Sequence, residues 1–149
     1  MYAPHTVTVY NAYQHLDTLK NVYVITILEG VFLDISKAAN VIKSGLENAD
    51  AATLFIPFDI KAVNGVTGET QTYVEPKVYE RLDDKSAYWT IRAGGTISNK
   101  DCFFVKRKVV DDRDFQDIDD FYDNVYRVTS VDVRDFGSPS MQHWEVSGR

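Results

Sequence analysis

The sequence predicts a mainly β protein, an antiparallel β-barrel or sandwich with two or three short helices. Residues 5–13 alternate apolar and polar side chains, and so do the two stretches around Gly137–Ser138–Pro139, which is typical of half-buried strands joined by a turn. Residues 22–35 are almost continuously β-branched or aromatic, which indicates a long strand buried on both faces. With 149 residues, 44% of them hydrophobic and 13% aromatic, the chain can bury one core. We therefore expect a single β-rich domain, residues 1–149.

The predicted strands are short apolar or alternating runs bounded by turn residues: 5–13, 22–35, 52–60, 87–95, 102–110, 126–133 and 141–146. In the second of them, Glu29–Gly30 is a point where glycine permits a bulge or a bend. In the third, Pro57 indicates an edge position or an interruption, because proline cannot donate to a strand ladder. Asn64–Gly65 is the turn signal of a loop or hairpin tip over residues 64–71, and residues 94–101 form a second predicted turn.

The alternation changes phase within the penultimate strand. Tyr126 and Val128 share one parity, whereas Val131 and Val133 share the other. A bulge near Thr129–Ser130 would return all four side chains to the core. In the last strand, Trp144 and Val146 are predicted to point inward.

Three segments fit short helices: 36–43, 76–82 and 111–123. Ser36 could cap the first and Gly45 could end it, although Val41–Ile42 would also suit a strand. Pro76 fits the first turn of the second helix.

The third helical segment, residues 111–123, carries seven aspartates and one arginine, and the rest of the chain is neutral. Three aromatic and aliphatic residues stand there at helical spacing: Phe115, Ile118 and Tyr122. Three aspartates would lie near the positive helix N-terminus, where carboxylates are favoured: Asp111, Asp112 and Asp114. The only dense basic patch is 106–108. Because nucleic-acid binders normally carry a basic stripe, sequence-specific DNA or RNA recognition is disfavoured.

His143–Trp144–Glu145 is the stretch most suggestive of chemistry. On a strand, His143 and Glu145 point to the face opposite Trp144, toward solvent or a neighbouring subunit. A catalytic histidine needs an orienting acid and a reacting group within hydrogen-bond reach, which neighbours on one strand do not supply. We therefore interpret the stretch as one strand of a closing hairpin and predict no catalytic residues.

The remaining candidates for chemistry are isolated in the sequence. His5 and His15 match no metal-ligand spacing, and Cys102 is the only cysteine, so we predict no metal, no cofactor and an inert core thiol. The aspartate run lacks the glycine and terminal glutamate of a helix–loop–helix calcium site, so a solvated helix face is the default and a looser calcium site the alternative. The N-terminal residues do not form a secretion signal, and no apolar run is long enough to span a bilayer.

Two stretches carry a family resemblance: "DISKAANVIKSGLENADAATLFIPF" in the first half, and the ending "YDNVYRVTSVDVRDFGSPSMQHWEVSGR". The resemblance extends over nearly the full chain, and these two stretches carry it. Through them the chain resembles a group of small minor structural proteins of phages and prophages of Gram-positive bacteria, associated with the head–tail joining region. These motifs are structural and contain no catalytic signature.

The resemblance implies a non-enzymatic virion protein, made in the host bacterial cytoplasm, that acts in the connector, neck or adjoining tail end. Its partners would be portal, connector or tail proteins, with further copies of itself in the assembled particle and no membrane. Charged and polar residues are then candidates for subunit contact or for facing a DNA channel: Lys106, Arg107, Lys108, Asp117, Asp119, Asp120, His143 and Glu145.

A rival interpretation is a small β module that binds carbohydrate or single-stranded nucleic acid. Such modules stack their ligands on exposed aromatic side chains. Tyr73, Tyr88 and Trp89 would have to lie exposed together in a groove for this function. Burial of the three would favour assembly instead.

Overall fold

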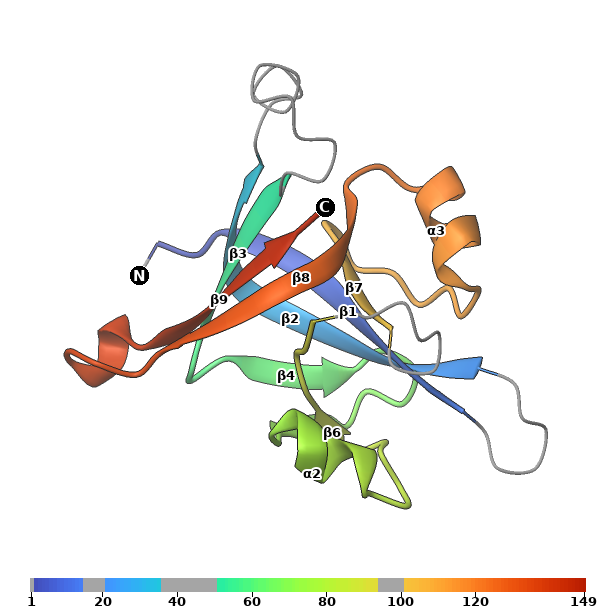
Figure 1. The fold of residues 1–149 in the computed structure, drawn as a ribbon, viewed down its shortest axis with the longest axis horizontal. Helices are drawn as coiled ribbons and strands as arrows, with labels where there is room; N and C mark the ends of the chain where they lie inside the picture. The colour runs from blue at the N-terminus through green and yellow to red at the C-terminus, as the bar shows by residue number, and fades with distance from the viewer. Residues whose placement is uncertain (1, 15–20, 36–50, 94–100) are drawn as a thin grey trace.

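The structure is a computed structural model that describes residues 2–14, 21–35, 51–93 and 101–149 (Figure 1). Its strands are β1 (His5–Gln14), β2 (Asn21–Ile35), β3 (Ala52–Pro57), β4 (Lys61–Asn64), β5 (Thr70–Tyr73), β6 (Tyr88–Trp89), β7 (Cys102–Val105), β8 (Val125–Arg134) and β9 (His143–Gly148). Its helices are α2 (Pro76–Glu80), α3 (Phe115–Phe121) and the 3-10 turn η2 (Pro139–Met141). The helix predicted at 36–43 with Gly45, and the turn at 94–101 except for Asp101, lie outside the described residues.

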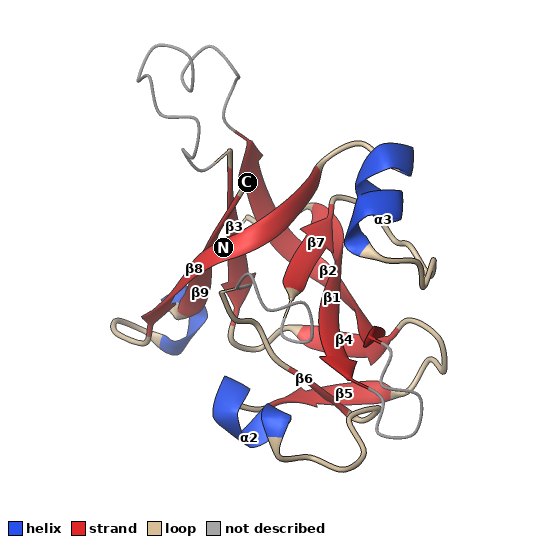
Figure 2. Cartoon of the chain, turned by 45° about the vertical axis from the view of Figure 1, so that its right-hand side comes forward, coloured by secondary structure: helices blue, strands red, loops and turns tan. Residues whose placement is uncertain are grey.

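Six strands close into an antiparallel barrel in the order β1-β7-β8-β9-β3-β2, because β1 also pairs with β2. Strands β4, β5 and β6 continue from β2 below the barrel, and β5 and β6 are parallel (Figures 1 and 2). The predicted mainly β class is confirmed, in the form of a barrel. Its described helices lie outside the sheet, with α3 beside β7 and α2 beside β6 (Figure 2).

Strand β2 bends where the sequence predicts. Residues 26–29 pair with β4, whereas residues 32–35 pair with β3. Between these two segments Gly30 has φ +96°, a backbone conformation that side chains with a Cβ rarely adopt. One strand can therefore serve two neighbours on the same edge, and the sheet curls.

The bulge in β8 also forms, because the register with β9 shifts between Val128 and Ser130. Tyr126 and Val128 are buried, and Val131 packs against the same core. The prediction for Val133 is wrong, since its side chain is 55% exposed. The bulge turns Val133 to the same face as Val131, as predicted. Its side chain is nevertheless exposed because the β8–β9 hairpin extends past the barrel at that point (Figure 1).

Three strand predictions are too long. The described residues of 87–95 contribute only β6. Residues 102–110 contribute only β7, because the hydroxyl of Thr8 binds the segment that follows this strand. It donates to the Arg107 carbonyl at 2.6 Å and accepts from the Val109 N–H at 2.9 Å, which draws that segment over β1. Strand β3 ends at Pro57, which therefore marks an interruption and not an edge, since β3 lies between β2 and β9.

Two apolar clusters hold the fold together. The larger fills the barrel and includes Leu28, Leu54, Phe104 and Val146. The smaller lies on the outside of β1, β2 and β7, where Ile118 of α3 packs in the same cluster as Tyr10, Ile25 and Phe103. These clusters occupy opposite faces of the same strands, so the first half of β2 is buried on both faces as predicted. For its second half the prediction is wrong, since Phe32 is half-buried and Asp34 is exposed.

Both described helices match their sequence signals. Pro76 opens α2 and Tyr79 is its buried residue. In α3 the Asp114 carboxylate accepts from the Asp117 N–H at 3.0 Å, which caps the first turn, and Ile118 is buried. The predicted acidic helix therefore forms, but only over Phe115–Phe121, so Asp111 and Asp112 precede it. The aspartates within it, Asp117, Asp119 and Asp120, are exposed.

We expect Leu54→Ala to lower the free energy of unfolding by about 2–5 kcal/mol, because Leu54 is fully buried and alanine leaves a cavity. Urea titration followed by circular dichroism measures the effect. The exposed Val66 is the matched control, and Val66→Ala should change the free energy by no more than about 0.5 kcal/mol. Equal losses in the two variants would contradict the burial described here.

Candidate interaction surface

The outward face of β8, β9, β3 and the second half of β2 carries the most distinctive set of surface side chains; we call it the outer face. Strand register sets its rows: Asp132, Glu145, Phe55 and Phe32 lie opposite one another across the four strands. Their neighbours along each strand, such as Trp144, point into the barrel. The next row pairs Arg134 with His143.

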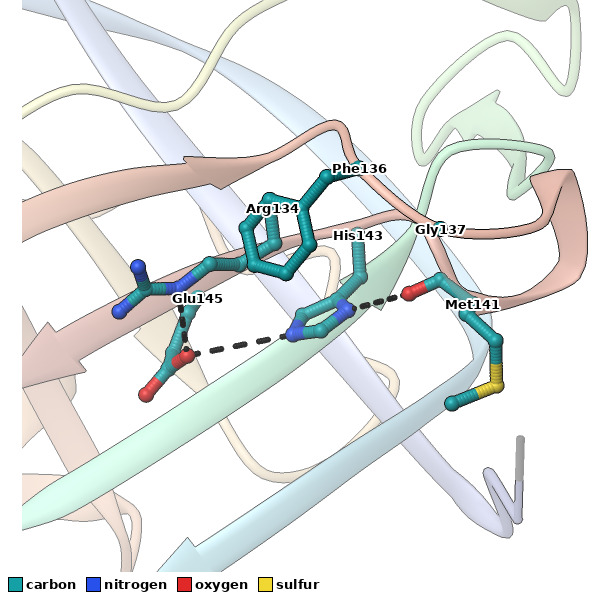
Figure 3. A pocket seen from close by; sticks show the side chains of 6 residues that line it. All are labelled: Arg134, Phe136, Gly137, Met141, His143 and Glu145. Atoms are coloured by element: carbon teal, nitrogen blue, oxygen red, sulfur yellow. Dashed lines mark hydrogen bonds and ion pairs between the residues drawn. The ribbon is translucent and has the colours of Figure 1, made fainter.

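Charged side chains interact with one another at the end of the outer face next to the turn between β8 and β9. Arg134 Nε donates to Glu145 Oε2 at 3.1 Å (Figure 3). Asp132 Oδ2 lies 3.8 Å from the same guanidinium. His143 Nε2 lies 3.9 Å from Glu145 Oε2, while His143 Nδ1 lies 2.8 Å from the Met141 carbonyl oxygen. Because that oxygen can only accept, this contact orients the ring with a proton on Nδ1. The side chains of His143 and Glu145 are thus engaged in holding the hairpin.

Aromatic rings cross the outer face from β9 to the N-terminal segment; we call them the aromatic row. The ring of His143 lies 5.7 Å from that of Phe55, which lies 5.8 Å from Phe32. Phe32 in turn lies 5.6 Å from His5 and 6.4 Å from Tyr2. The row is continuous over four strands, β9, β3, β2 and β1, and ends at the exposed Tyr2.

A hollow of about 500 Å³ opens at the same end of the outer face, beside the turn between β8 and β9. It is lined by Arg134, Phe136, Gly137, Met141, His143 and Glu145 (Figure 3). Phe136 is 69% exposed and Met141 61%, so two large apolar side chains stand in water next to a charged rim. Gly137 makes this possible, since the turn requires φ +85° there. The hollow is suited to receiving an apolar side chain of a partner.

The predicted basic and acidic residues form a separate surface. Arg107 and Lys108 are exposed and Lys106 is half-buried, and all three aspartates singled out on α3, Asp117, Asp119 and Asp120, are exposed. The Arg107 guanidinium lies 5.6 Å from the ring centre of Tyr122 at the end of α3, which links the two clusters. This surface is on the side of the barrel opposite the hairpin that carries His143 and Glu145 (Figure 1). The candidate residues therefore divide into two places.

Sequence reasoning missed the apolar residues of the outer face: Phe32, Phe55, Phe136 and Met141. A signal was present for two of them. Phe32 stands between Val31 and Leu33, and Phe55 between Leu54 and Ile56, so each occupies a position where an exposed strand face would carry a polar side chain. An apolar residue at such a position indicates a second covered or contacted face.

The three aromatic residues named for the rival binding module do not lie together on an exposed platform. Trp89 is 1% exposed, and Tyr73 packs 4.4 Å from Trp144 within the barrel cluster. Tyr88 is half-buried in β6. Trp89 and Tyr73 therefore contribute to the core, which argues against a stacking groove formed by the three rings.

Neither a metal cluster nor a membrane-spanning helix is found in the described ranges. There, no three His, Cys, Asp or Glu side chains stand close enough together to hold a metal ion. The helices of those ranges are also too short and too polar to cross a bilayer.

Cys102 is fully buried in β7, and this burial raises the pKa of its thiol to about 12. At pH 8 a pKa that high leaves roughly one thiol in ten thousand as the reactive thiolate. We expect an aromatic disulfide reagent to label the folded protein at least about a hundredfold more slowly than the protein in 8 M urea. Rapid labelling of the folded protein, followed by its absorbance, would show that the thiol is accessible.

Comparison with known proteins adds a family but no activity. No curated protein and no solved structure matches the chain. One family does match, over residues 2–149, and its description is a family of unknown function, DUF6751. Since this match covers nearly the whole chain, the chain belongs to the DUF6751 family. The match includes both the outer face and the charged surface at α3.

Proposed function

We propose that the protein is a non-enzymatic structural component of a phage or prophage virion, acting through protein–protein contacts at the head–tail connector, the neck or the adjoining tail end. The observation that carries the contact role is the outer face, where exposed Phe136 and Met141 flank the hollow beside the aromatic row. The phage context is supported by the resemblance of the two sequence stretches described above.

The composition of the outer face favours protein contact. Protein–protein interfaces combine an apolar, often aromatic centre with a polar rim. Here the apolar side chains at the tip of the hairpin lie beside Arg134 and Glu145, whose charges can orient a partner. Burial of a phenylalanine or methionine side chain contributes about 1.5–3 kcal/mol each, so these two residues alone could anchor a neighbour.

The charged surface at α3 supplies a second possible contact. Its aspartates are outward and its basic neighbours lie beside the end of the helix. Such a surface can pair with the opposite charges of an adjoining subunit, or face a channel through which DNA passes without adhering. Two contact surfaces on opposite sides of a barrel are what a component placed between neighbours requires.

The first test replaces Phe136 and Met141 together by serine in the virion-encoding genome. We expect particle yield to fall at least about tenfold, because the anchor side chains are lost while the barrel is untouched. Val66→Ser, at another exposed apolar position, is the control and should leave the yield unchanged. Normal infectious particles from the double variant, or purified particles without the protein, would refute the proposal.

The second test replaces Asp117, Asp119 and Asp120 by asparagine. These side chains are exposed, so the melting temperature of the purified protein should stay within about 3 °C, whereas assembly or DNA passage should be impaired. Replacing Asp59 and Asp83 by asparagine and Glu69 by glutamine makes the same change in net charge elsewhere on the surface. Equal particle yields and equal DNA content in the two triple variants would remove α3 from the contact surfaces.

A further inference from the structure

We infer that the open edge of β8 is a dimerisation edge, which pairs antiparallel with the same edge of a second copy of this chain. The inference rests on the proposed function, since it names one partner of the hairpin. The hairpin is the part of the described chain that reaches farthest from the barrel at the left of Figure 1.

The edge is defined by how β8 uses its two sides. Residues 125–127 pair with β7, and residues 128–134 pair with β9 on the opposite side. From Ser130 to Arg134, β9 is the one strand that pairs with β8 in the described part of the chain. A strand edge without a partner strand offers N–H and C=O groups that another strand can join.

Exposed apolar side chains accompany the edge. Val133 lies on it, and Phe136 and Met141 follow at the tip of the same hairpin, all three more than half exposed. Monomeric proteins usually protect an open edge with charges or prolines, and they keep large apolar side chains apart. A partner strand along β8 would cover Val133 and bring the tip against the second copy.

Charge selects the second copy as the occupant and fixes the register. In an antiparallel pair with Val133 on the two-fold axis, Asp132 lies directly opposite the second copy's Arg134, and symmetry produces this pair twice. A pair centred on Asp132 would instead place two carboxylates opposite each other. In the first register the edge is complementary to itself.

The orientation of the Asp132 and Arg134 side chains is consistent with this register. Asp132 and Arg134 already lie on the same outward face, 3.8 Å apart, with Arg134 bound to Glu145. A two-fold axis perpendicular to the sheet keeps the outer faces of both copies on one side, so the opposed residues point the same way. The guanidinium has five N–H donors and can bind a second carboxylate while it keeps Glu145.

Charge reversal on the purified full-length chain tests the pairing, with sedimentation velocity as the measurement. We expect the wild-type protein to dimerise, and Asp132→Arg and Arg134→Asp each to weaken dimerisation at least about tenfold, because each places like charges opposite each other twice. Mixing the two single variants should restore association, since every opposed pair is then Asp with Arg. The double variant should also dimerise. Asp83→Arg is the control for charge and should behave as wild type.

Cross-linking tests the register separately. Val133→Cys puts two thiols on the axis, so mild oxidation should give a covalent dimer rapidly, with Cys102 buried and out of reach. In the same register the two copies of residue 136 stand on the order of 20 Å apart, so Phe136→Cys should cross-link at least about tenfold more slowly. Circular dichroism identifies any variant that fails to fold. The double variant and the cross-link at Val133→Cys test the register without the two single charge reversals.

A wild-type protein that stays monomeric at every concentration would overturn the inference, as would a dimer that survives each single charge reversal or cross-links equally from 133 and 136. The proposed function fails by different results. A dimer in solution that is absent from particles would refute the virion role alone, and a monomer present in particles would refute the dimer alone.

Discussion

The pairing of β1 with β2 is the constraint on which the rest of the structure depends. It runs along the whole of β1, from His5 to Gln14, and it closes the sheet into a barrel. Closure fixes which side of every strand is inside. On one parity Val7 and Leu28 meet within the barrel, and on the other Tyr10 and Ile25 face outward, where they require a cover. Helix α3 supplies that cover with Ile118, and this placement turns its aspartates toward solvent.

The bend at Gly30 extends the same logic to the outer face. Beyond it β2 leaves β4 and joins β3, so Phe32 lies on the outside next to Phe55, where none of the described helices covers it. The register of β3 with β9 then continues the row to Glu145 and His143. The barrel thus has one outside surface that its own helix covers and one that carries aromatic rings and charges. The second of these is the one available for contact in the described chain.

Local sequence patterns were sufficient to predict seven of the nine described strands, the bend at Gly30 and the bulge in β8, because each depends on neighbours in sequence. The short strands β4 and β5 were not predicted, since they flank what was predicted as a loop or hairpin tip. Strand ends depend on distant contacts: Thr8 captures the carbonyl of Arg107, 99 residues away, and shortens β7. The position of Val133 could not be predicted for a related reason. Alternation gives the face to which a side chain points, but the amount of structure beneath that face depends on how far the hairpin extends past the barrel. The outer face required the register of four strands, which the sequence alone does not provide.

The hairpin combines features that oppose each other in a monomer. The exposed apolar side chains of the hairpin favour association: Val133, Phe136 and Met141. Its charged side chains disfavour pairing with a strand that lacks the complementary order of charges: Asp132, Arg134 and Asp135. The other side of the hairpin is already occupied, since β9 pairs with β3. Two copies joined along β8 would therefore use the open edge of both hairpins, and growth would stop at a closed pair. Because pairing along β8 stops at two copies, a ring or longer assembly would need a second contact surface. The charged surface at α3 lies away from the β8 edge and could supply it.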